Sequence, residues 1–594
     1  MILIKLYSNM EQKFETIEFN RGLNIILGEI RIPENREKDT HNLGKSTLGL
    51  LLDYCLLKGK SKEFFLFKHF ELFKEFVFFL ELEYSDGDYL TIKRGVENNS
   101  KISFLKHNEK SLDCRNLSDD EWTHFEMPLK KAKLELDSIL NLEVIKPWDY
   151  RKPVSYALRG QDDYTDVFKL KKFGGKHIDW KPYLAKILGL DAYLVQAHYE
   201  LKEKYDKIKT QKDTLKKELN GLTDSLDKLE GLILIKEEET TKIKHQLEEF
   251  NFEIEDSQVN KSLVEEIDIQ LSSLNKERYY ISSGIEKLEQ SLNKDKIIFN
   301  PNDAKTLFEE AGVLFDGQIK KTYEELIQFN KDITKEREQY LKEELIELKN
   351  DLEEVQTQIK ELNQKRSKAL YYLKDSSVVS KYKTLSQNLI TLEAEILNLK
   401  LQEEKLVRYQ EISIELEELD SKIEKNKIDI STNVKESSNK ESVYSQIKLN
   451  FNKIIKTILN KDALISISQN KEGNLEFKEE ILDESGQATS ESDGKTYKKL
   501  LCMAFDLSIN EVYKEKKYTH FIYHDGFIEK LDNRKKEKLI ELIREMSKAD
   551  FQYIATLIDS ELPNQDKSIF EEDEIILTLH DEGNNGLLFK MSSW

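Results

Sequence analysis

Gly44, Lys45, Ser46 and Thr47 are the residues whose order points most directly to chemistry. They open an apolar stretch, LGLLLDYCLL, that is typical of a buried helix, and they follow GLNIILGEI, a run that predicts a strand ending near Gly28. A strand, a loop, Gly-Lys-Ser and a helix make up the phosphate-binding P-loop. In that arrangement backbone N–H groups hold phosphate oxygens, Lys45 reaches the β- and γ-phosphates of ATP, and the Ser46 hydroxyl ligates Mg²⁺.

The spacing of the glycines departs from the P-loop motif. The first glycine of the motif lies five residues before the second, a position that Asp39 occupies here, whereas Gly28 lies sixteen residues before Gly44. Either the loop carries the insertion EIRIPENREKDT or the Gly-Lys-Ser run is accidental. With an extended loop, the nucleotide-binding residues of this segment are Gly28, Asn42, Gly44, Lys45, Ser46 and Thr47.

The C-terminal part supplies three further elements in the order found in ABC-type ATPases. In SESDGKTYKKLLCMAFDLSI, Ser492, Gly494 and Lys495 open a helix in the form of a degenerate signature motif. In an ABC-type dimer this helix N-terminus faces the γ-phosphate bound by the opposite subunit. The apolar run THFIYHD then ends in Asp525, the acid that a Walker B motif requires to hold Mg²⁺ through water. Asp532 follows at the spacing of the D-loop.

Two long stretches carry apolar residues at alternating steps of three and four, the a/d pattern of a coiled coil. They extend over about 195–295 and about 341–449. Because two apolar positions per heptad need a partner helix to bury them, we expect an antiparallel hairpin whose arms are each on the order of 150 Å long. The alternative is two independent amphipathic helices packed in a bundle. In the first stretch, Lys212 is a polar exception to the pattern.

The segments around the coiled coil complete the predicted organisation. Residues 296–340 interrupt the heptads with one proline and two glycines, and we expect a small hinge or tip there. Outside the arm, short runs such as FVFFLELEY, YLTIKRG and FQYIATLI predict strands. Residues 1–194 and 450–594 are therefore expected to be the two halves of one α/β head, brought together by the hairpin.

The composition narrows the class of protein. Only 7 Pro and 22 Gly in 594 residues favour long uninterrupted helices. The net charge of -20 argues against a basic nucleic-acid coat protein. Three separated cysteines, Cys55, Cys114 and Cys502, offer neither a disulfide framework nor a cysteine zinc site. Without a signal pattern or an apolar run of about 20 residues, we expect a cytoplasmic protein with no membrane partner.

With these motifs in place, the whole chain resembles the SMC/RecN-type coiled-coil ABC ATPases. The resemblance implies an α/β fold with a split P-loop head and a long antiparallel coiled-coil arm. More narrowly, the extended loop before Gly44, the turn formed by His524, Asp525 and Gly526, and the run GVLFDGQIKKTYEELIQFNKDITKER resemble the bacterial YydD-like family. Relatives occur as ATPase subunits of antiphage defence systems, such as those of the Lamassu or ABC three-component type.

The resemblance implies a homodimer that uses ATP and Mg²⁺ to close two heads around double-stranded DNA. In this hypothesis the chain senses or clamps foreign or damaged DNA, in antiviral defence or DNA repair, and activates an associated effector subunit such as a nuclease. In the alternative hypothesis the chain is an ATP-gated coiled-coil scaffold that recruits protein partners without binding DNA. The sequence carries no nuclease, Toprim-like or protease motif, so any cutting would belong to a partner.

One departure from the family pattern concerns hydrolysis. The catalytic glutamate of such ATPases directly follows the Walker B acid, and Gly526 stands in that place, where it cannot act as a base. His524 and Glu529 are the candidates to orient the attacking water. The alternatives are a structural role for His524 in its strand and slow hydrolysis by a protein that acts mainly as an ATP-gated clamp.

Two further family positions are matched only in part. The switch histidine expected at the end of the strand after the D-loop is replaced by Ile558 or Asp559. The Q-loop glutamine, which joins Mg²⁺ to the lobe that carries the arm, is best matched by Gln161 in YALRGQDDY. The expected Mg²⁺ ligands are therefore Ser46, Gln161 and Asp525.

A cluster of lysines precedes the first arm and would lie near the neck of the head. Lysines at this place could contact a DNA backbone without reading its sequence. The alternative is an ordinary solvated surface, since the whole chain is rich in charge. The predicted DNA-binding residues are Lys169, Lys171, Lys172, Lys176 and Lys181.

Overall fold

The computed structural model describes residues 1–35, 43–219, 225–249, 256–294, 317–371, 376–529, 531–548 and 551–592. The chain divides into two compact units. The head unit consists of Met1–Asp206 and Glu418–Trp594, and the arm unit consists of Lys207–Glu417. The head therefore includes residues 418–449, which the sequence pattern had assigned to the returning helix of the arm.

The head unit contains a five-stranded parallel sheet in the order β13-β3-β12-β11-β8. Strands β3, β11 and β12 are short apolar runs buried on both faces, as is usual for a parallel sheet, whereas the edge strand β13 is partly exposed. Since β3 pairs with β12 and β13, the two ends of the chain share one sheet, as the split head requires. The bounds are β3 (Gly22–Glu29), β8 (Leu158–Arg159), β11 (Phe521–His524), β12 (Gln552–Ile558) and β13 (Ile575–His580).

A six-stranded antiparallel sheet, in the order β2-β1-β4-β5-β6-β7, forms a second layer of the head. The Gln552 side chain of β12 connects the two sheets, because it accepts a hydrogen bond from Leu3 N and donates one to Leu3 O, both at 2.7 Å. The bounds are β1 (Ile2–Ser8), β2 (Ile17–Glu18), β4 (Val77–Ser85), β5 (Asp88–Gly95), β6 (Lys101–His107) and β7 (His124–Pro128). A separate hairpin contains β9 (Ala463–Gln469) and β10 (Leu475–Ile481).

Helix α1 (Lys45–Cys55) lies between the two sheets of the head, where it contacts β8 and β12 on one side and β4 and β5 on the other. Its apolar residues Leu48, Leu51 and Leu52 are fully buried. Helix α14 (Lys495–Tyr513) packs on β11, and α15 (Asn533–Ser547) packs on β3 and β12. The other helices are α2 (Phe65–Lys68), α3 (Phe70–Phe73), α4 (Leu129–Leu140), α5 (Arg151–Ala157), α6 (Lys181–Ile187) and α13 (Val443–Leu459).

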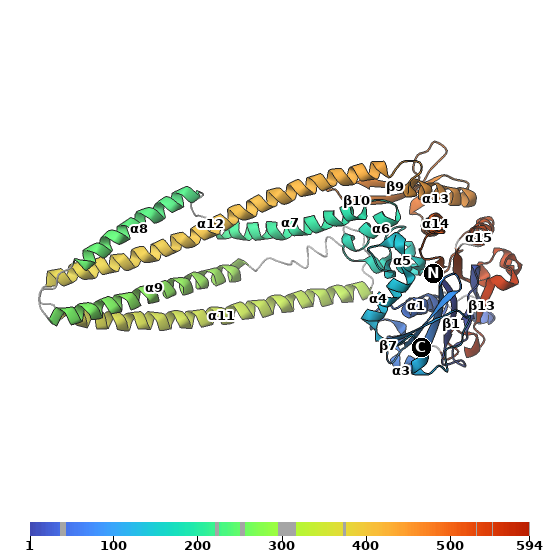
Figure 1. Ribbon diagram of the computed structural model, residues 1–594, viewed down its shortest axis with the longest axis horizontal. Coiled ribbons are helices and arrows are strands. Elements are labelled where there is room, and N and C mark those ends of the chain that lie inside the picture. Colours follow the sequence, from blue (N-terminus) through green and yellow to red (C-terminus); the bar gives the residue numbers. More distant parts are fainter. Residues whose placement is uncertain are drawn as a thin grey trace. The chain divides into compact units, whose positions relative to one another are not determined.

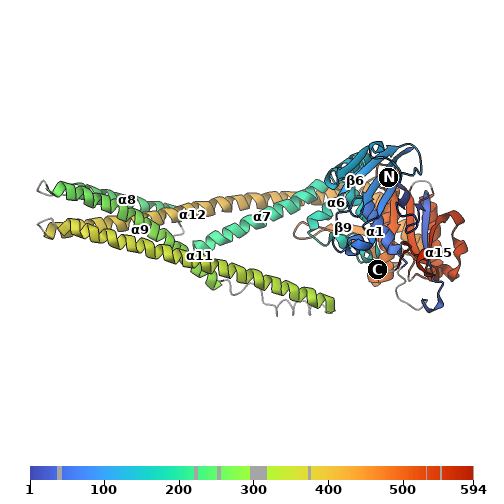
Figure 2. The ribbon, with the colours of Figure 1, turned by 90° about the horizontal axis from the view of Figure 1, so that it is seen from below.

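The long helices are α7 (Ala192–Glu218), α8 (Leu226–Glu248), α9 (Asp256–Lys294), α11 (Gly317–Tyr371) and α12 (Ser376–Glu436). Within the arm unit, α8 runs antiparallel to α12, and α9 lies beside α11 in both Figure 1 and Figure 2. Ion pairs from Lys236 to Glu395 and from Lys400 to Glu237 connect α8 with α12. The polar exception Lys212 places its ammonium 5.2 Å from the centre of the Tyr409 ring.

The path of the arm differs from a single two-helix hairpin. Val264 of α9 packs with Ala369 and Leu370 at the end of α11 and with Tyr382 near the start of α12. The segment expected as one outgoing helix therefore reverses direction, and α9 runs antiparallel to α11. Heptad patterns are alike along all these helices, so the pattern shows that a partner is needed without showing which helix it is.

The predicted hinge or tip is also corrected. Residues 295–316 lie outside the described part of the chain, and residues 317–340 belong to helix α11 rather than to a tip. The described helices instead converge where α8 and α11 end and α9 and α12 begin, around the buried ion pair of Arg366 with Asp268 at 2.7 Å. Over the described residues, no helix has the length and apolar character that a bilayer span requires.

Candidate functional site

The P-loop segment has the predicted strand, loop and helix. Strand β3 ends at Glu29, and α1 begins at Lys45. Gly44 caps the helix with φ +95°, a left-handed conformation that favours glycine, and a β-carbon there would lie 2.6 Å from Leu588 Cβ. At the end of β3, a β-carbon on Gly28 would lie 3.2 Å from Lys45 Cδ. Both glycines therefore leave space for the helix start and for the lysine stem.

Lys45 lies among carboxylates at the start of α1. Burial lowers the pKa of its ammonium, and the charges of Glu561, Asp525 and Glu529 oppose that shift. The backbone here is fixed by Tyr523 of β11, whose hydroxyl donates to Lys45 O at 2.8 Å. A cation with a flexible stem in this position can exchange its carboxylate neighbours for phosphate oxygens.

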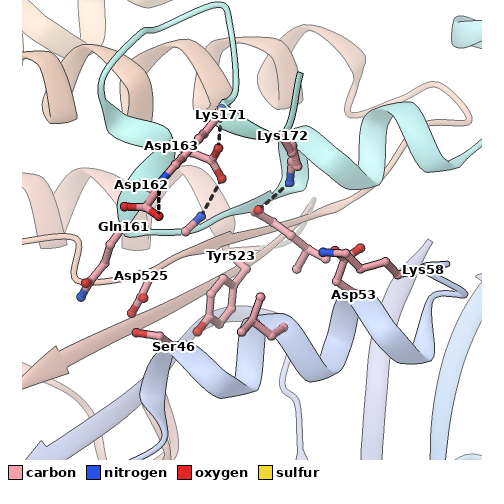
Figure 3. Close-up of a pocket in the computed structure, with 14 residues that line it drawn as sticks. Ser46, Asp53, Lys58, Gln161, Asp162, Asp163, Lys171, Lys172, Tyr523 and Asp525 are labelled. Carbon is pink, nitrogen blue, oxygen red and sulfur yellow. Dashed lines mark hydrogen bonds and ion pairs between the residues drawn. The ribbon is translucent and has the colours of Figure 1, made fainter. Parts of the chain in front are cut away.

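A pocket of about 480 Å³ opens along one side of α1 and is lined by Ser46, Gln161 and Asp525. Figure 3 shows Gln161 projecting from the segment above α1 toward Asp525 and Ser46. Gln161 begins the short helix η4 (Gln161–Tyr164) that follows β8. Three residues from distant parts of the sequence, all predicted as Mg²⁺ ligands, therefore face one cavity of the size that small ligands occupy.

Asp525 is almost completely buried at the end of β11, and Thr556 of β12 holds its carboxylate. The Thr556 hydroxyl donates to Asp525 Oδ1 at 2.5 Å and accepts from Gly526 N at 2.9 Å. Hydroxyl, amide and carboxylate oxygens are the ligand types that Mg²⁺ prefers, so this set of residues fits the ion. Among the described residues no cluster of three His, Cys, Asp or Glu side chains forms a cage, and Mg²⁺ in phosphate sites needs none.

The other end of the pocket is lined by charged side chains of both signs, including Asp162 and Asp163. Lys58, Lys171 and Lys172 line it together with Asp53 (Figure 3). Burial lowers the pKa of Lys172 to about 8, against the opposing charges of Asp53 and Asp163. Burial raises the pKa of Asp53, but Arg151 and Lys58 outweigh that effect and hold it at about 2. The cavity thus continues past the P-loop serine into a region of paired charges that the sequence motifs did not predict.

His524 is not placed to activate water, which corrects its assignment as a base. It is fully buried, its Nδ1 lies 2.6 Å from the Tyr553 hydroxyl, and its Nε2 lies 3.0 Å from Asp506 Oδ2. Asp506 also accepts two hydrogen bonds from Arg159, at 2.7 and 3.0 Å. Both ring nitrogens are therefore engaged inside the protein, and burial lowers the pKa of the imidazole. These contacts agree with the alternative prediction, in which His524 is a structural residue of its strand.

Glu529 lies in the turn after Asp525, beside Gly526. Its Oε2 accepts a hydrogen bond from Lys499 Nζ at 2.9 Å, and its side chain keeps 31% of its surface exposed. Of the two predicted bases, only this one combines water access with a place next to the Walker B acid.

The remaining nucleotide-binding candidates have separate positions in the head. Ser492 belongs to the short helix η7 (Ser490–Asp493), where its hydroxyl donates to Thr489 O, and Gly494 caps α14. Lys495 is exposed at the first position of α14. Thr47 is half-buried in α1, and Asn42 lies outside the described residues. Of these residues, the four that the structure describes do not line the pocket beside Ser46.

Two acids near the site have structural partners. Asp532, predicted for the D-loop, caps α15 by accepting from Lys535 N at 3.1 Å. Asp559, at the place of the switch histidine, accepts from Ile30 N at 3.3 Å and so holds the start of the extended loop. Asp532 and Asp559 therefore each have a hydrogen-bond partner within a single head.

Two of the five predicted DNA-binding lysines point inward. Lys181 is 7% exposed, and its ammonium donates to Leu475 O at 2.6 Å. Lys172 directs its ammonium into the pocket, where it donates to Leu158 O at 3.1 Å. Of the two, Lys181 is buried, whereas Lys172 keeps an exposed side chain whose ammonium has a backbone carbonyl partner. A carbonyl partner that comes from tertiary packing leaves no signal in the local sequence.

The other three lysines are accessible to solvent to different degrees. Lys169 is half-buried, whereas Lys171 and Lys176 are exposed. Lys171 forms an exposed ion pair with Asp162 at 2.7 Å, and Lys176 forms one with Glu203 at 3.3 Å. Exposed pairs of this kind contribute about 0–1 kcal/mol, so their lysines remain available to other anions.

Sequence reasoning missed the residues that hold the site together. Thr556, Lys499 and Glu561 contact or face the Walker B turn and Lys45, and Asp581 accepts from the backbone of Arg31 and Ile32 in the extended loop. None of them belongs to a motif with fixed spacing. For Thr556, Glu561 and Asp581 the available signal was a place in or just after an apolar strand, which is too common to identify a site, and Lys499 lies within helix α14.

In comparisons with known proteins, one family model matches the C-terminal part of the chain. Residues 454–593 match a family described as "Uncharacterised protein conserved in bacteria (DUF2326)". No curated protein matches the chain. The matched segment contains α14, β11 and β12, and therefore the predicted signature and Walker B elements.

Solved structures of Smc head domains are also similar over most of the chain. One, from Pyrococcus yayanosii, contains the head domain with a coiled coil and joint; it is 14% identical, covers 95% of this chain and 94% of that chain, and has a TM-score of 0.35. Another, from Pyrococcus furiosus, is bound to the C-terminal domain of ScpA; it is 11% identical, covers 95% and 91%, and has a TM-score of 0.31. These superpositions are loose, so the fold rests on the strand order and the site geometry given above.

Proposed function

We propose that this protein is an SMC-like ATPase that binds ATP and Mg²⁺ at the start of α1. The observation that carries the proposal is the convergence of Ser46, Gln161 and Asp525 on one pocket next to Lys45. These residues come from β-strand ends and a helix start that are up to about 480 positions apart in the sequence. A P-loop that arose by accident would have no reason to meet a Walker B acid and a Q-loop amide.

Each residue has a defined task in this proposal. The backbone N–H groups at the start of α1 and the Lys45 ammonium bind phosphate oxygens, while Ser46 and Asp525 orient the ion. Bound Mg²⁺ supplies neutralisation of phosphate charge. Gln161, on η4, would connect the occupied site to the segment between β8 and the first long helix. The site therefore has the parts for binding and positioning a nucleoside triphosphate.

We infer that hydrolysis involves a second copy of the chain. The start of α14, with Ser492, Gly494 and Lys495, does not line the pocket of its own head, and its exposed N-terminus suits a phosphate on another head. A homodimer with two ATP molecules between the heads would use both elements. The turnover expected of it is slow, since residue 526 is glycine.

Nucleotide binding is the first test, with Lys45→Ala compared against Lys62→Ala. Lys62 is an exposed lysine a short distance after α1 and serves as the matched control. We expect Lys45→Ala to weaken binding of a fluorescent ATP analogue by at least about 100-fold and Lys62→Ala to leave it unchanged. Retained affinity in Lys45→Ala would refute the P-loop assignment.

For the biological role we propose clamping or sensing of double-stranded DNA, with an effector or accessory protein subunit as further partner, as in antiviral defence or DNA repair. The exposed Lys171 and Lys176 support this role, because their weak ion pairs can give way to DNA phosphates. The alternative is an ATP-gated scaffold without DNA. The inward direction of Lys172 and Lys181 and the net charge of -20 favour that alternative.

Charge reversal separates the two roles. In a DNA clamp, Lys171→Glu with Lys176→Glu should weaken DNA binding and reduce the slope of log affinity against log salt by roughly 2, one unit for each lost phosphate contact. The matched control reverses Lys538 and Lys548, two exposed lysines at α15. If wild-type protein with ATP binds no DNA, or if both double variants behave alike, the scaffold role is favoured.

A further inference from the structure

In the turn after the predicted Walker B acid, the side chain of Glu529 occupies the space beside Gly526. Gly526 adopts φ +63°, and a β-carbon added there would overlap the carboxylate of Glu529. The carboxylate of Glu529 therefore occupies the space in which a side chain at position 526 would begin. A glycine at 526 is what allows a carboxylate from three residues further on to reach this place.

Thr556 fixes the position of this turn. Its hydroxyl joins Asp525 Oδ1 to Gly526 N, so the backbone that carries the turn is tied to β12 on the side of the parallel sheet. Residues 525 to 528 are buried, whereas Glu529 remains partly exposed. The Glu529 carboxylate thus extends from a turn that is fixed by hydrogen bonds. It lies near a predicted Mg²⁺ ligand and is accessible to water.

Lys499 holds the Glu529 carboxylate from the opposite side. The two side chains are 2.9 Å apart, and only 11% of the Lys499 side chain is exposed. The same ammonium lies 4.8 Å from the centre of the Tyr164 ring, at the end of η4. Because Lys499 is in the second turn of α14, one ammonium contacts the Walker B turn, the segment that carries Gln161, and the helix that begins at the signature motif.

We propose that Glu529 is the catalytic base that replaces the glutamate missing at position 526, and that Lys499 is its positioning residue. The proposal rests on the proposed ATPase function and deepens it. It also connects α14 with hydrolysis, because a movement of this helix would displace the Lys499 ammonium that positions the Glu529 carboxylate.

The chemical step that Glu529 would serve is hydrolysis of ATP. The oxygen of a water molecule forms a bond to the γ-phosphorus while the bond from that phosphorus to the β,γ-bridging oxygen breaks. The bridging oxygen leaves with the bonding electron pair on ADP, and the proton of the water passes to the Glu529 carboxylate and then to the released phosphate or to solvent. No oxidant, reductant or second substrate is required.

The contribution of Lys499 is orientation. A glutamate side chain has three rotatable bonds, and a charge-assisted hydrogen bond to a nearly buried ammonium selects one arrangement. A base displaced by about 1 Å from the attacking water can cost about 100-fold in rate. Loss of Lys499 should therefore lower kcat while the P-loop still binds ATP.

The test measures ATP binding and single-turnover hydrolysis separately in the full-length protein. We expect Glu529→Gln to bind ATP within about twofold of wild type and to hydrolyse it at least about 100-fold more slowly. Lys499→Met should lose about tenfold or more in rate with an unchanged KM, and Lys499→Arg should restore most of it. The matched controls are Glu537→Gln and Lys538→Met, two exposed positions on α15, which should match wild type.

A double variant distinguishes positioning from a general structural effect. If Lys499 acts through Glu529, then Lys499→Met with Glu529→Gln should be no slower than Glu529→Gln alone. A further loss in the double variant, or no rescue by arginine, would overturn the positioning role.

The remaining outcomes separate this proposal from the proposed function. Wild-type hydrolysis with an unimpaired Glu529→Gln would overturn the role of Glu529 and leave the ATPase intact. ATP binding by wild type with no hydrolysis under any condition would overturn the catalytic base while leaving a nucleotide-gated protein. Failure of wild type to bind ATP would refute the proposed function itself.

Discussion

In the parallel sheet of the head unit a buried arginine has an ion-pair partner, whereas in the antiparallel sheet a buried carboxylate has none among the described residues. Arg159 of β8 and Asp506 of α14 form a fully enclosed ion pair that His524 of β11 joins. By contrast, Glu81 of β4 is fully buried, its Oε1 accepts from Ser111 N at 2.7 Å, and its Oε2 has no hydrogen-bond partner among the residues that the structure describes. Burial raises the pKa of Glu81 to about 7.

The difference follows the location of the candidate site. Arg159 immediately precedes the segment that carries Gln161, and its carbonyl accepts from Asp525 N at 3.2 Å. The enclosed ion pair therefore fixes the backbone on both sides of the pocket. Such pairs add little net stability, but they specify one arrangement of the groups around them. Glu81 fixes no comparable group in the described structure. The unfavourable free energy of burying its charge is reflected in its raised pKa.

The largest effect is expected when the enclosed pair is broken. Arg159→Met leaves Asp506 as a buried charge with only His524 beside it and should lower the free energy of unfolding by about 3–5 kcal/mol. Urea unfolding followed by tryptophan fluorescence measures this, since all four tryptophans belong to the head unit. The control is Lys74→Met, which removes an exposed pair with Glu71 in the same unit. Equal stability of the two variants would contradict the comparison.

An intermediate effect of opposite sign is expected at Glu81. Because its folded pKa of about 7 exceeds the ordinary value of 4.5, the folded state holds an extra proton between these values, and stability is lost as pH rises through 7. Glu81→Gln removes this cost and should raise the free energy of unfolding by about 1–3 kcal/mol at pH 8. At pH 4 the gain should vanish.

The same measurement on Glu63→Gln provides the control for Glu81. Glu63 is an exposed residue of the head unit whose charge is not among those that shift the pKa of Glu81, and its variant should show no difference between the two pH values. A gain in Glu81→Gln that is independent of pH would mean that packing, rather than charge, causes it.

The smallest effect is expected for a charge pair outside both sheets. Lys171 and Asp162 keep 67% and 75% of their side chains exposed, so Lys171→Met should change the free energy of unfolding by less than about 0.5 kcal/mol. The same urea titration measures it. A loss comparable to that of Arg159→Met would show that η4 depends on this pair and would remove the distinction between enclosed and exposed charge.

The elements predicted from local patterns agree with the structure. Strand β3, helix α1 and strands β11 and β12 appear at the expected places, because apolar runs bounded by glycine, proline or charge determine them locally. The α/β class follows from their alternation with helices.

What sequence reasoning did not predict depends on residues distant in the chain. His524 has the residue type of a base, and only its contacts with Tyr553 and Asp506 remove it from that role. Lys172 and Lys181 lie in the same run as Lys171, but their carbonyl partners come from tertiary packing. The pairing of α9 with α11 was missed because repeated heptads fit several partners equally well.

The sheet order of the head also has a consequence for synthesis. Strand β3 ends at Glu29, but the two strands that flank it begin only at Gln552 and Ile575, 523 and 546 residues later. At about 5–20 residues per second, the ribosome needs roughly half a minute to two minutes to cover that distance. During this time the apolar strand that leads into the P-loop has neither neighbour, so the nascent chain must be shielded by chaperones or by the antiparallel sheet, and a prematurely terminated chain cannot assemble a nucleotide site.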